Sequence, residues 1–146
     1  MKIDSFKEEQ AYILGIIDKI NTKISSFGFI VESSVARDVR VDVSEFISSF
    51  KIQLTKEENL FNSDRLLLNN NDDQVKKTAR IIFNDAEALM KRIVAFDTKW
   101  SVFEIVNSTR DFCFEFGFLA DKIRNRFAME ENLYSSLVTQ STILEN

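Results

Sequence analysis

The chain has 146 residues, of which 45% are hydrophobic and 29% charged, and these values indicate one globular domain spanning residues 1–146. Its formal net charge of −4 argues against a nucleic-acid surface, because phosphate neutralisation needs clustered Lys and Arg. No apolar run approaches the roughly 20 residues that a membrane span needs, so we expect no membrane contact.

Proline and glycine, which interrupt helices, and cysteine, which forms disulfides, are scarce in this chain. There is no proline and there are three glycines, so we expect long helices with few breaks. The single cysteine, Cys113, has no partner within the chain, and we expect a buried, inert thiol. The acidic residues of the N-terminal MKIDSFKEEQ do not fit a secretion signal, which predicts a cytoplasmic protein.

The first predicted helix begins near Phe6, and its apolar positions recur at steps of four and three along one helical face. These positions are Phe6, Gln10, Ile13, Ile17, Ile20, Ile24 and Phe27, with Gln10 as the polar member. The β-branched stretch FIVESSVARDVRVDV, residues 29–43, follows. We expect it to be a connection that contains either a short strand or a helical turn.

Three further helices are predicted along the rest of the chain. The second begins between Asp42 and Ser44, with Ser44 as its N-cap, and ends in the polar turn LNNNDD, residues 68–73. The third carries an apolar heptad pattern at Val75, Ala79, Ile82, Ala86, Leu89, Ile93 and Phe96. The fourth runs from about Ser101 to Leu137. Four amphipathic helices with mostly short connections predict an all-α, up-down-up-down four-helix bundle.

Each predicted helix has one place where its apolar face becomes polar or small. These places are Gln10, Gln53 with Glu57, Ala86, and Arg126 with Glu130. Two of them open a repeated phrase, QLTKEENLF from Gln53 and RFAMEENLY from Arg126. Positions at one depth on facing helices form the layers in which bundles hold metals and cofactors. The candidate polar core layer therefore consists of Gln10, Gln53, Glu57, Arg126 and Glu130.

These positions resemble those of hemerythrin-like domains, the His-His-Glu cation-binding bundles. That family carries a His in the first helix, His-x-x-x-Glu in the second, a His in the third and His-x-x-x-Glu in the fourth. The segments of this chain that look like the four helices are FKEEQAYILGIIDKI, QLTKEENLF, FNDAEALMKRI and RFAMEENLYSSL. The two family Glu positions correspond to Glu57 and Glu130. The resemblance implies a bundle of hemerythrin-like architecture over nearly the whole chain.

The departure from that family concerns every imidazole ligand. The four His positions correspond to Gln10, Gln53, Ala86 and Arg126, and the chain contains no His. A non-haem di-iron centre needs imidazoles beside bridging carboxylates. Two carboxylates, two amides and a guanidinium form a far poorer cation site, so we expect no metal and no cofactor. Without His, only generic carboxylates are available for catalysis, and we expect no enzymatic activity.

A shorter resemblance concerns the last helix. The stretch LADKIRNRFAMEENLYSSLV looks like the C-terminal helix of the regulators of sigma D, an anti-sigma family whose members are four-helix bundles of similar length. Those proteins bind the primary sigma factor of bacterial RNA polymerase. The resemblance implies a bundle that acts by binding another protein.

The sequence allows two placements of the polar layer. In the first, the layer is internal: Arg126 pairs with Glu130 four residues later, its forked guanidinium reaches a second carboxylate, and the two glutamines add hydrogen bonds. In the second, a small rotation of each helix carries these groups to the solvated rim. An internal network must be nearly complete, because each buried polar group left unpaired costs several kcal/mol.

Aromatic residues crowd the first half of the fourth helix. Phe112, Phe114, Phe116 and Phe118 occupy alternate positions and so point all around a helix. We expect most of this band in the core, with the rest partly exposed, covered by residues 29–43, or part of an interface. The four phenylalanines are therefore candidate interface residues.

The functional prediction is a metal-free, non-enzymatic bundle that acts through protein contacts as a bacterial regulatory module. The candidate partners are a sigma factor, RNA polymerase or a second copy of the chain. Two alternatives stay open: a metal or small-molecule sensor that uses Glu57 and Glu130, and a structural subunit of a homo-oligomeric assembly.

Overall fold

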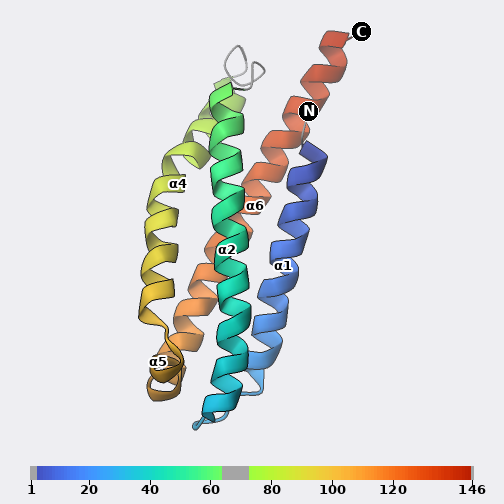
Figure 1. The fold of residues 1–146 in the computed structure, drawn as a ribbon. Helices are drawn as coiled ribbons and strands as arrows, with labels where there is room; N and C mark the ends of the chain where they lie inside the picture. Colours follow the sequence, from blue (N-terminus) through green and yellow to red (C-terminus); the bar gives the residue numbers. More distant parts are fainter. Residues whose placement is uncertain (1–2, 64–72, 146) are drawn as a thin grey trace.

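The computed structural model describes residues 3–63 and 73–145, in which every regular element is a helix and no strand occurs (Figure 1). The helices in these residues are α1 (Ile3–Ser25), α2 (Ser33–Ser63), α4 (Asp73–Lys99), α5 (Val102–Asn107) and α6 (Thr109–Glu145). The all-α prediction is confirmed. Apart from Asp73, the predicted turn LNNNDD lies outside the described residues. None of the helices described combines the length and apolar character that crossing a membrane requires.

The four long helices lie alongside one another, and successive ones run in opposite directions (Figure 1). Helix α1 packs against α2 and α6, and α4 packs against the same two helices. The short α5 contacts α2 and α6 at the end of the molecule where α4 finishes. Residues from all the long helices therefore face one shared interior.

Helix α2 begins nine residues or more before the predicted start. Residues 33–43 are therefore part of a long helix, and the prediction of a connection with a short strand or a helical turn is wrong for them. The amide of Ala36 donates to the carbonyl of Glu32 (3.0 Å), which starts the helical pattern. Ala36, Val39 and Val43 are fully buried and follow helical spacing, so packing against the core outweighs the weak helix propensity of β-branched residues. Ser44 consequently lies inside α2 and does not cap it.

The predicted fourth helix is also divided. Ser108 has φ −133° and ψ 49°, which separates α5 from α6. Ser101 caps α5, because its hydroxyl oxygen accepts from the amide of Glu104 (3.2 Å). The Thr109 hydroxyl donates to the carbonyl of Ile105 (2.7 Å), which satisfies one acceptor at the end of α5. Residues that cap and end helices, here two serines, thus set this boundary.

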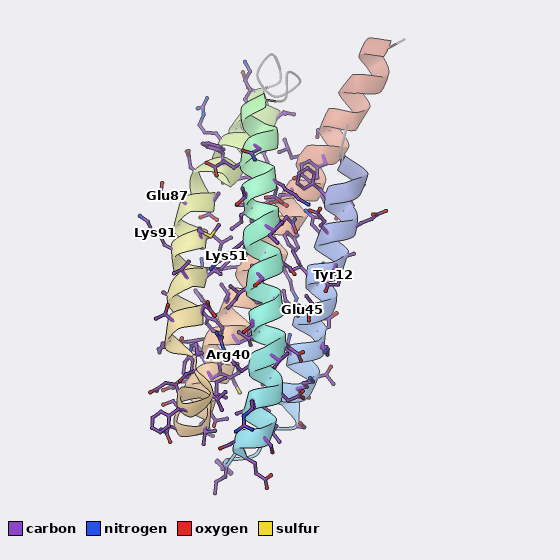
Figure 2. All side chains as sticks on the ribbon, viewed as in Figure 1. Tyr12, Arg40, Glu45, Lys51, Glu87 and Lys91 are labelled. Atoms are coloured by element: carbon purple, nitrogen blue, oxygen red, sulfur yellow. The ribbon has the colours of Figure 1, made fainter. Side chains whose placement is uncertain are left out.

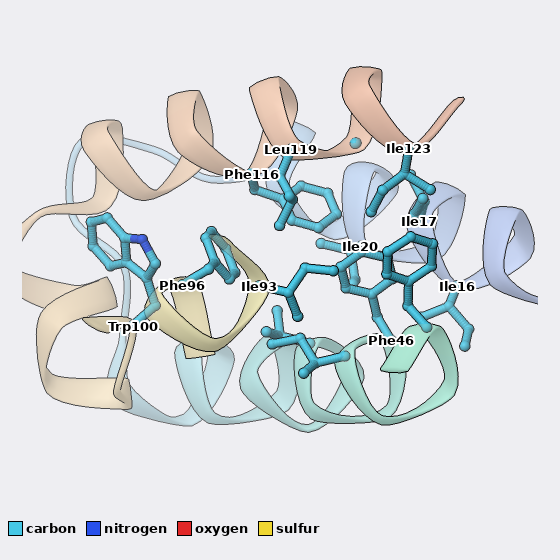
Figure 3. Close-up of a cluster of buried hydrophobic side chains, with 14 of the residues drawn as sticks. Ile16, Ile17, Ile20, Phe46, Ile93, Phe96, Trp100, Phe116, Leu119 and Ile123 are labelled. Atoms are coloured by element: carbon cyan, nitrogen blue, oxygen red, sulfur yellow. The ribbon is translucent and has the colours of Figure 1, made fainter. Parts of the chain in front are cut away.

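The main core is rich in aromatic and aliphatic side chains (Figure 3). Phe46 of α2 meets Phe116 of α6 edge-on, with ring centres 6.0 Å apart. Trp100 packs edge-on against Phe112 at 5.4 Å, and its indole N–H donates to Glu115 (2.7 Å). Such pairs add to the stability that comes from burying their area.

A second, smaller apolar cluster lies toward the other end of the helices. Its buried members are Phe6, Val75, Ile82, Leu133 and Tyr134. In α1, Gln10 lies between Phe6 of this cluster and Ile13 of the main core. The candidate polar layer therefore separates two apolar regions.

Polar pairs on the outside connect neighbouring helices (Figure 2). The Tyr12 hydroxyl of α1 donates to Glu45 of α2, and Arg40 of α2 pairs with Asp97 of α4. Exposed pairs of this kind each contribute about 0–1 kcal/mol. These weak surface pairs add little to helix packing, which depends mainly on the buried side chains.

Candidate functional site

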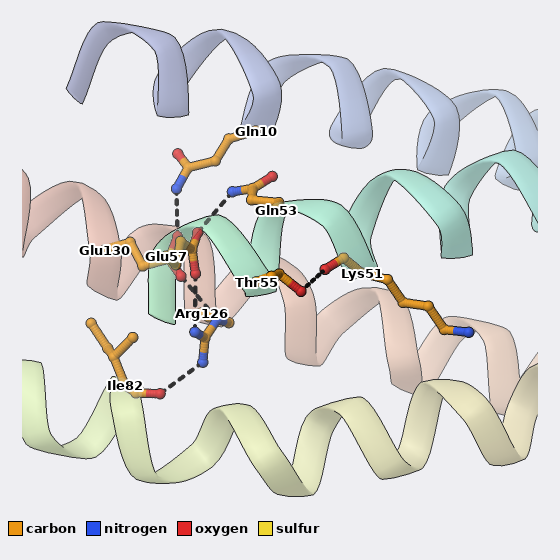
Figure 4. Close-up of polar contacts among 8 residues, drawn as sticks. All are labelled: Gln10, Lys51, Gln53, Thr55, Glu57, Ile82, Arg126 and Glu130. Carbon is orange, nitrogen blue, oxygen red and sulfur yellow. Dashed lines mark hydrogen bonds and ion pairs between the residues drawn. The ribbon is translucent and has the colours of Figure 1, made fainter. Parts of the chain in front are cut away.

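All five side chains of the candidate polar layer are inside the molecule (Figure 4). The exposed fractions are 7% for Gln10, 1% for Gln53, 1% for Glu57, 4% for Arg126 and 0% for Glu130. They come from α1, α2 and α6, at the depth where the apolar stripes of these helices are interrupted. Placement on a solvated rim is therefore excluded.

Arg126 occupies the centre of the layer. Its Nη2 donates to Oε2 of Glu57 (3.0 Å), and its Nε lies 2.9 Å from Oε1 of Glu130. Its Nη1 donates to the backbone carbonyl of Ile82 (2.9 Å). One guanidinium thus joins carboxyl groups from two helices and the backbone of a third. Lysine, with a single compact ammonium group, does not match this forked geometry.

The two glutamines hold the carboxyl groups from the other side (Figure 4). Nε2 of Gln10 donates to Oε2 of Glu130 (2.6 Å), across from α1 to α6. Nε2 of Gln53 donates to Oε1 of Glu57 (2.9 Å), one turn along α2. Each carboxyl group therefore has one amide contact and one guanidinium contact.

Helix α4 contributes a backbone atom rather than a side chain. Ala86, the position singled out on this helix, is half-buried beside the main core. Ala86 lies four residues after Ile82, so its amide is the expected helical partner of the Ile82 carbonyl. A carbonyl oxygen has two lone pairs, so the Ile82 oxygen can accept from Arg126 as well as from that amide. Sequence reasoning missed this acceptor, because a backbone carbonyl is present at every residue and leaves no signal in a sequence.

Burial and a neighbouring carboxyl group favour the protonated form of Glu130. Burial, the charge of Glu57 and a hydrogen bond with Glu57 raise the pKa of Glu130 from 4.5 to about 9, against the opposing effects of Arg126 and Gln10. The same guanidinium lies beside both carboxyl groups and opposes this shift.

Some polar atoms of the layer have no hydrogen-bond partner among the described residues. They include Oε1 of Gln53 and the hydroxyl of the adjacent Tyr134. Nε of Arg126 and Oε1 of Glu130 are close enough for an ion pair, but their geometry does not make a hydrogen bond. Burial raises the pKa of Tyr134 far above its usual range, so this phenol stays neutral. Each unsatisfied group costs about 1–3 kcal/mol.

The residues of the layer do not fit a di-iron centre. The two carboxyl groups bracket a fixed cation, and the raised pKa of Glu130 opposes the deprotonation that a metal ligand requires. The amide side chains supply neutral oxygens in place of imidazole nitrogens. Within residues 6–59 and 73–136, no group of three or more Cys, Asp or Glu side chains is arranged to hold a metal ion.

The aromatic band of α6 is split between interior and surface. Phe112 and Phe116 are fully buried, so including them among interface residues is wrong; four residues apart, they share the core face of α6. Phe114 is 77% exposed and Phe118 is 50% exposed. Cys113 is half-buried rather than buried, and desolvation raises the pKa of its thiol. Alternation places two rings inside and two outside.

Comparison with known proteins adds no relative to this description. No protein-family model, curated protein or solved structure matches the chain. The resemblances to hemerythrin-like domains and to the regulators of sigma D therefore stay predictions.

Proposed function

We propose that the chain is a hemerythrin-like, up-down-up-down four-helix bundle without metal, which binds another protein and catalyses no reaction. One observation carries this proposal: Arg126 lies between Glu57 and Glu130, with 3.0 and 2.9 Å contacts. The resemblance puts metal ligands at these three positions. A guanidinium stabilises carboxylates as a metal ion does, and it opposes the approach of a second cation.

The path of the chain supports the proposed architecture. Each long helix packs against two others, and the four run alternately in opposite directions (Figure 1). Short connections between antiparallel neighbours are typical of such bundles. A single domain covering residues 1–146 is part of the same proposal.

The polar composition of the layer supports the proposal that its residues replaced the metal ligands of an earlier cation site. Replacing a buried ion pair by apolar residues of similar volume is often neutral or stabilising by about 1–4 kcal/mol. A layer with unpaired atoms on Gln53 and Tyr134 is therefore not the arrangement that stability alone favours. Substitution of ligands in an existing cation site accounts for polar groups at these places.

A regulatory role in the bacterial cytoplasm is the function we propose for this scaffold. In the phrase RFAMEENLY, which carries the likeness to the regulators of sigma D, Arg126, Phe127 and Glu130 are buried. These three side chains cannot reach a partner directly, whereas the exposed Phe114 and Phe118 offer apolar area for one. Sigma factor and RNA polymerase are the first partners to test.

Affinity purification from the source cells tests the proposal. A tagged chain should retain one specific partner after salt washing, with sigma factor or RNA polymerase subunits examined first by immunoblotting. The matched control is the same chain carrying Phe114→Ser and Phe118→Ser, which alters exposed side chains alone. Recovery of the chain by itself, together with a stable oligomer in sedimentation, would replace this proposal by a homo-oligomeric structural role.

A further inference from the structure

A groove of about 310 Å³ runs between α4 and α6 on the outside of the molecule. Its lining residues are Arg92, Ala95, Phe96, Lys99, Phe114, Glu115, Phe118 and Leu119. Phe96 and Leu119 belong to the main core, whereas Phe114 and Phe118 stand 77% and 50% exposed. The groove thus combines an apolar floor with two aromatic side chains that are open to solvent.

Two cations contact one of these rings, Phe118. The guanidinium carbon of Arg92, from α4, lies 5.2 Å from the centre of the Phe118 ring. Nζ of Lys122, from α6, also lies 5.2 Å from that centre. An aromatic face attracts a cation by about 0.5–1 kcal/mol at exposed sites. This attraction gathers two like charges at one end of the groove.

Neither cation has a carboxylate partner among the described residues. Pairing along a helix requires an acid three or four residues away. The residues at those distances from Arg92 are Ala88, Leu89, Ala95 and Phe96, and those from Lys122 are Phe118, Leu119, Asn125 and Arg126. None of them is acidic, and no ion pair joins either cation to another helix within residues 6–59 and 73–136. The positive charge at Phe118 is therefore uncompensated.

The one acid that lines the groove is already engaged. Glu115 pairs with Lys99 and accepts the indole N–H of Trp100 (2.7 Å). Contacts with Lys99 and Trp100 hold the pKa of Glu115 below its usual range despite its partial burial. Glu115 is thus committed to Lys99 and Trp100 at its own end of the groove. A local positive charge persists on a chain whose net charge is −4.

We propose that this groove binds an acidic segment of a partner protein, in which a carboxylate lies beside an apolar or aromatic side chain. The apolar side chain packs on Phe114 and Phe118, and the carboxylate lies between Arg92 and Lys122. Arginine and aromatic residues are the types that most often dominate the affinity of interfaces. The proposal depends on the protein-binding function proposed above, and it adds the site and the chemistry of the partner.

Selection from a phage-displayed library of random peptides tests the groove directly. The bait is the full chain, compared with an Arg92→Glu/Lys122→Glu variant and with Phe118→Ala. The matched control is Arg37→Glu/Lys51→Glu on α2, which changes the net charge equally outside the groove. All five substituted side chains are exposed or half-buried, so the fold should survive; circular dichroism checks this.

Peptides selected on the wild-type chain should carry Asp or Glu next to an apolar residue. Their affinity should fall about tenfold or more in the groove charge-reversal variant and in Phe118→Ala, and it should weaken with added salt. The α2 control should bind as the wild type does. A selected pool without acidic residues, or equal binding by the groove variant, would overturn the proposal. So would a wild-type dimer that Arg92→Glu/Lys122→Glu dissociates, because the occupant would then be a second copy.

Affinity purification with the same variants separates this proposal from the one on which it depends. If the wild-type chain and the Arg92→Glu/Lys122→Glu variant retain the same cellular partner, the protein-binding function stands and the groove is the wrong site. If the wild-type chain retains no partner, the proposed function fails, and the peptide selection alone decides whether the groove binds acidic segments.

Discussion

Two arginines on facing helices use positive charge in opposite ways. Arg126 of α6 is 4% exposed and contacts two carboxyl groups and a backbone carbonyl. Arg92 of α4 is exposed and shares one aromatic ring with Lys122. Inside, polar groups neutralise one another; outside, a pair of cations has no acid opposite. The buried charge links three helices, and the exposed pair is where we propose that a partner binds.

Removing the buried cation should have the largest effect on stability. Arg126→Ala leaves two buried carboxyl groups without their cation and should lower the free energy of unfolding by about 3–5 kcal/mol. Lys122→Ala, four residues earlier, should change it by less than about 1 kcal/mol, because Lys122 is exposed. Urea denaturation of both variants measures the difference, and equal midpoints would contradict an internal role for Arg126.

A second substitution distinguishes lost charge from lost volume. If charge is the cause, adding Glu57→Gln to Arg126→Ala should recover part of the lost stability, since no unpaired carboxylate then remains at Glu57. If the double variant is no more stable than the single one, the cost comes from the cavity alone.

Substitutions in the aromatic band of α6 should differ in their effect on stability by nearly as much. Phe116→Ala should cost about 3–5 kcal/mol, because Phe116 is fully buried against Phe46 and Phe96. Phe114→Ala, two residues away on α6, should change stability by less than about 0.5 kcal/mol. Thermal unfolding of the two variants should give clearly different midpoints. A comparable loss for Phe114→Ala would mean that its ring is covered, for example by a second copy.

Lowering the pH should increase the free energy of unfolding, because Glu130 binds a proton more tightly in the folded chain than in the unfolded one. Its pKa is about 9 in the folded chain and near 4.5 when unfolded, so unfolding between these values releases a proton. The stabilising effect is complete below pH 4.5 and is lost as the pH rises toward 9, with a slope of at most about 1.4 kcal/mol per pH unit. Glu130→Gln should abolish this component. Parallel stability curves for the wild type and Glu130→Gln would contradict a protonated Glu130.

The groove variant should have only a modest effect on folding. Arg92→Glu/Lys122→Glu removes two exposed cation–aromatic contacts and should alter the free energy of unfolding by less than about 2 kcal/mol. Its effect should appear in binding instead. A large loss of stability would place these side chains in the structural network rather than at a partner surface.

Much of the helical framework could be predicted from sequence, and the exceptions have identifiable causes. Period-3.6 stripes located the interiors of α1 and α4, and the interrupted positions Gln10, Glu57 and Arg126 proved to be buried together. The start of α2 was misplaced because β-branched residues read as strand or connection until packing against the core is known. The break at Ser108 depends on local hydrogen bonds that no hydrophobic pattern records.

The site was less predictable than the helices. Side-chain chemistry identified the carboxyl groups and Arg126, but the Ile82 carbonyl is a backbone atom present in every sequence. The meeting of Arg92 and Lys122 on Phe118 joins residues from two helices, so it depends on how those helices rotate against each other. Sequence periodicity fixes which residues share a helix face, but it does not fix which faces meet.

Metal content is the measurement that tests the central claim most directly, because the account replaces a cation site by a guanidinium. The wild-type chain, purified from iron-supplemented cells without chelator, should contain only trace iron by elemental analysis. The matched variant Gln10→His/Gln53→His/Ala86→His/Arg126→His, which supplies imidazoles at the four positions, should gain iron. Iron at about two atoms per wild-type chain would contradict the account, because the layer around Arg126 would then be a working di-iron centre.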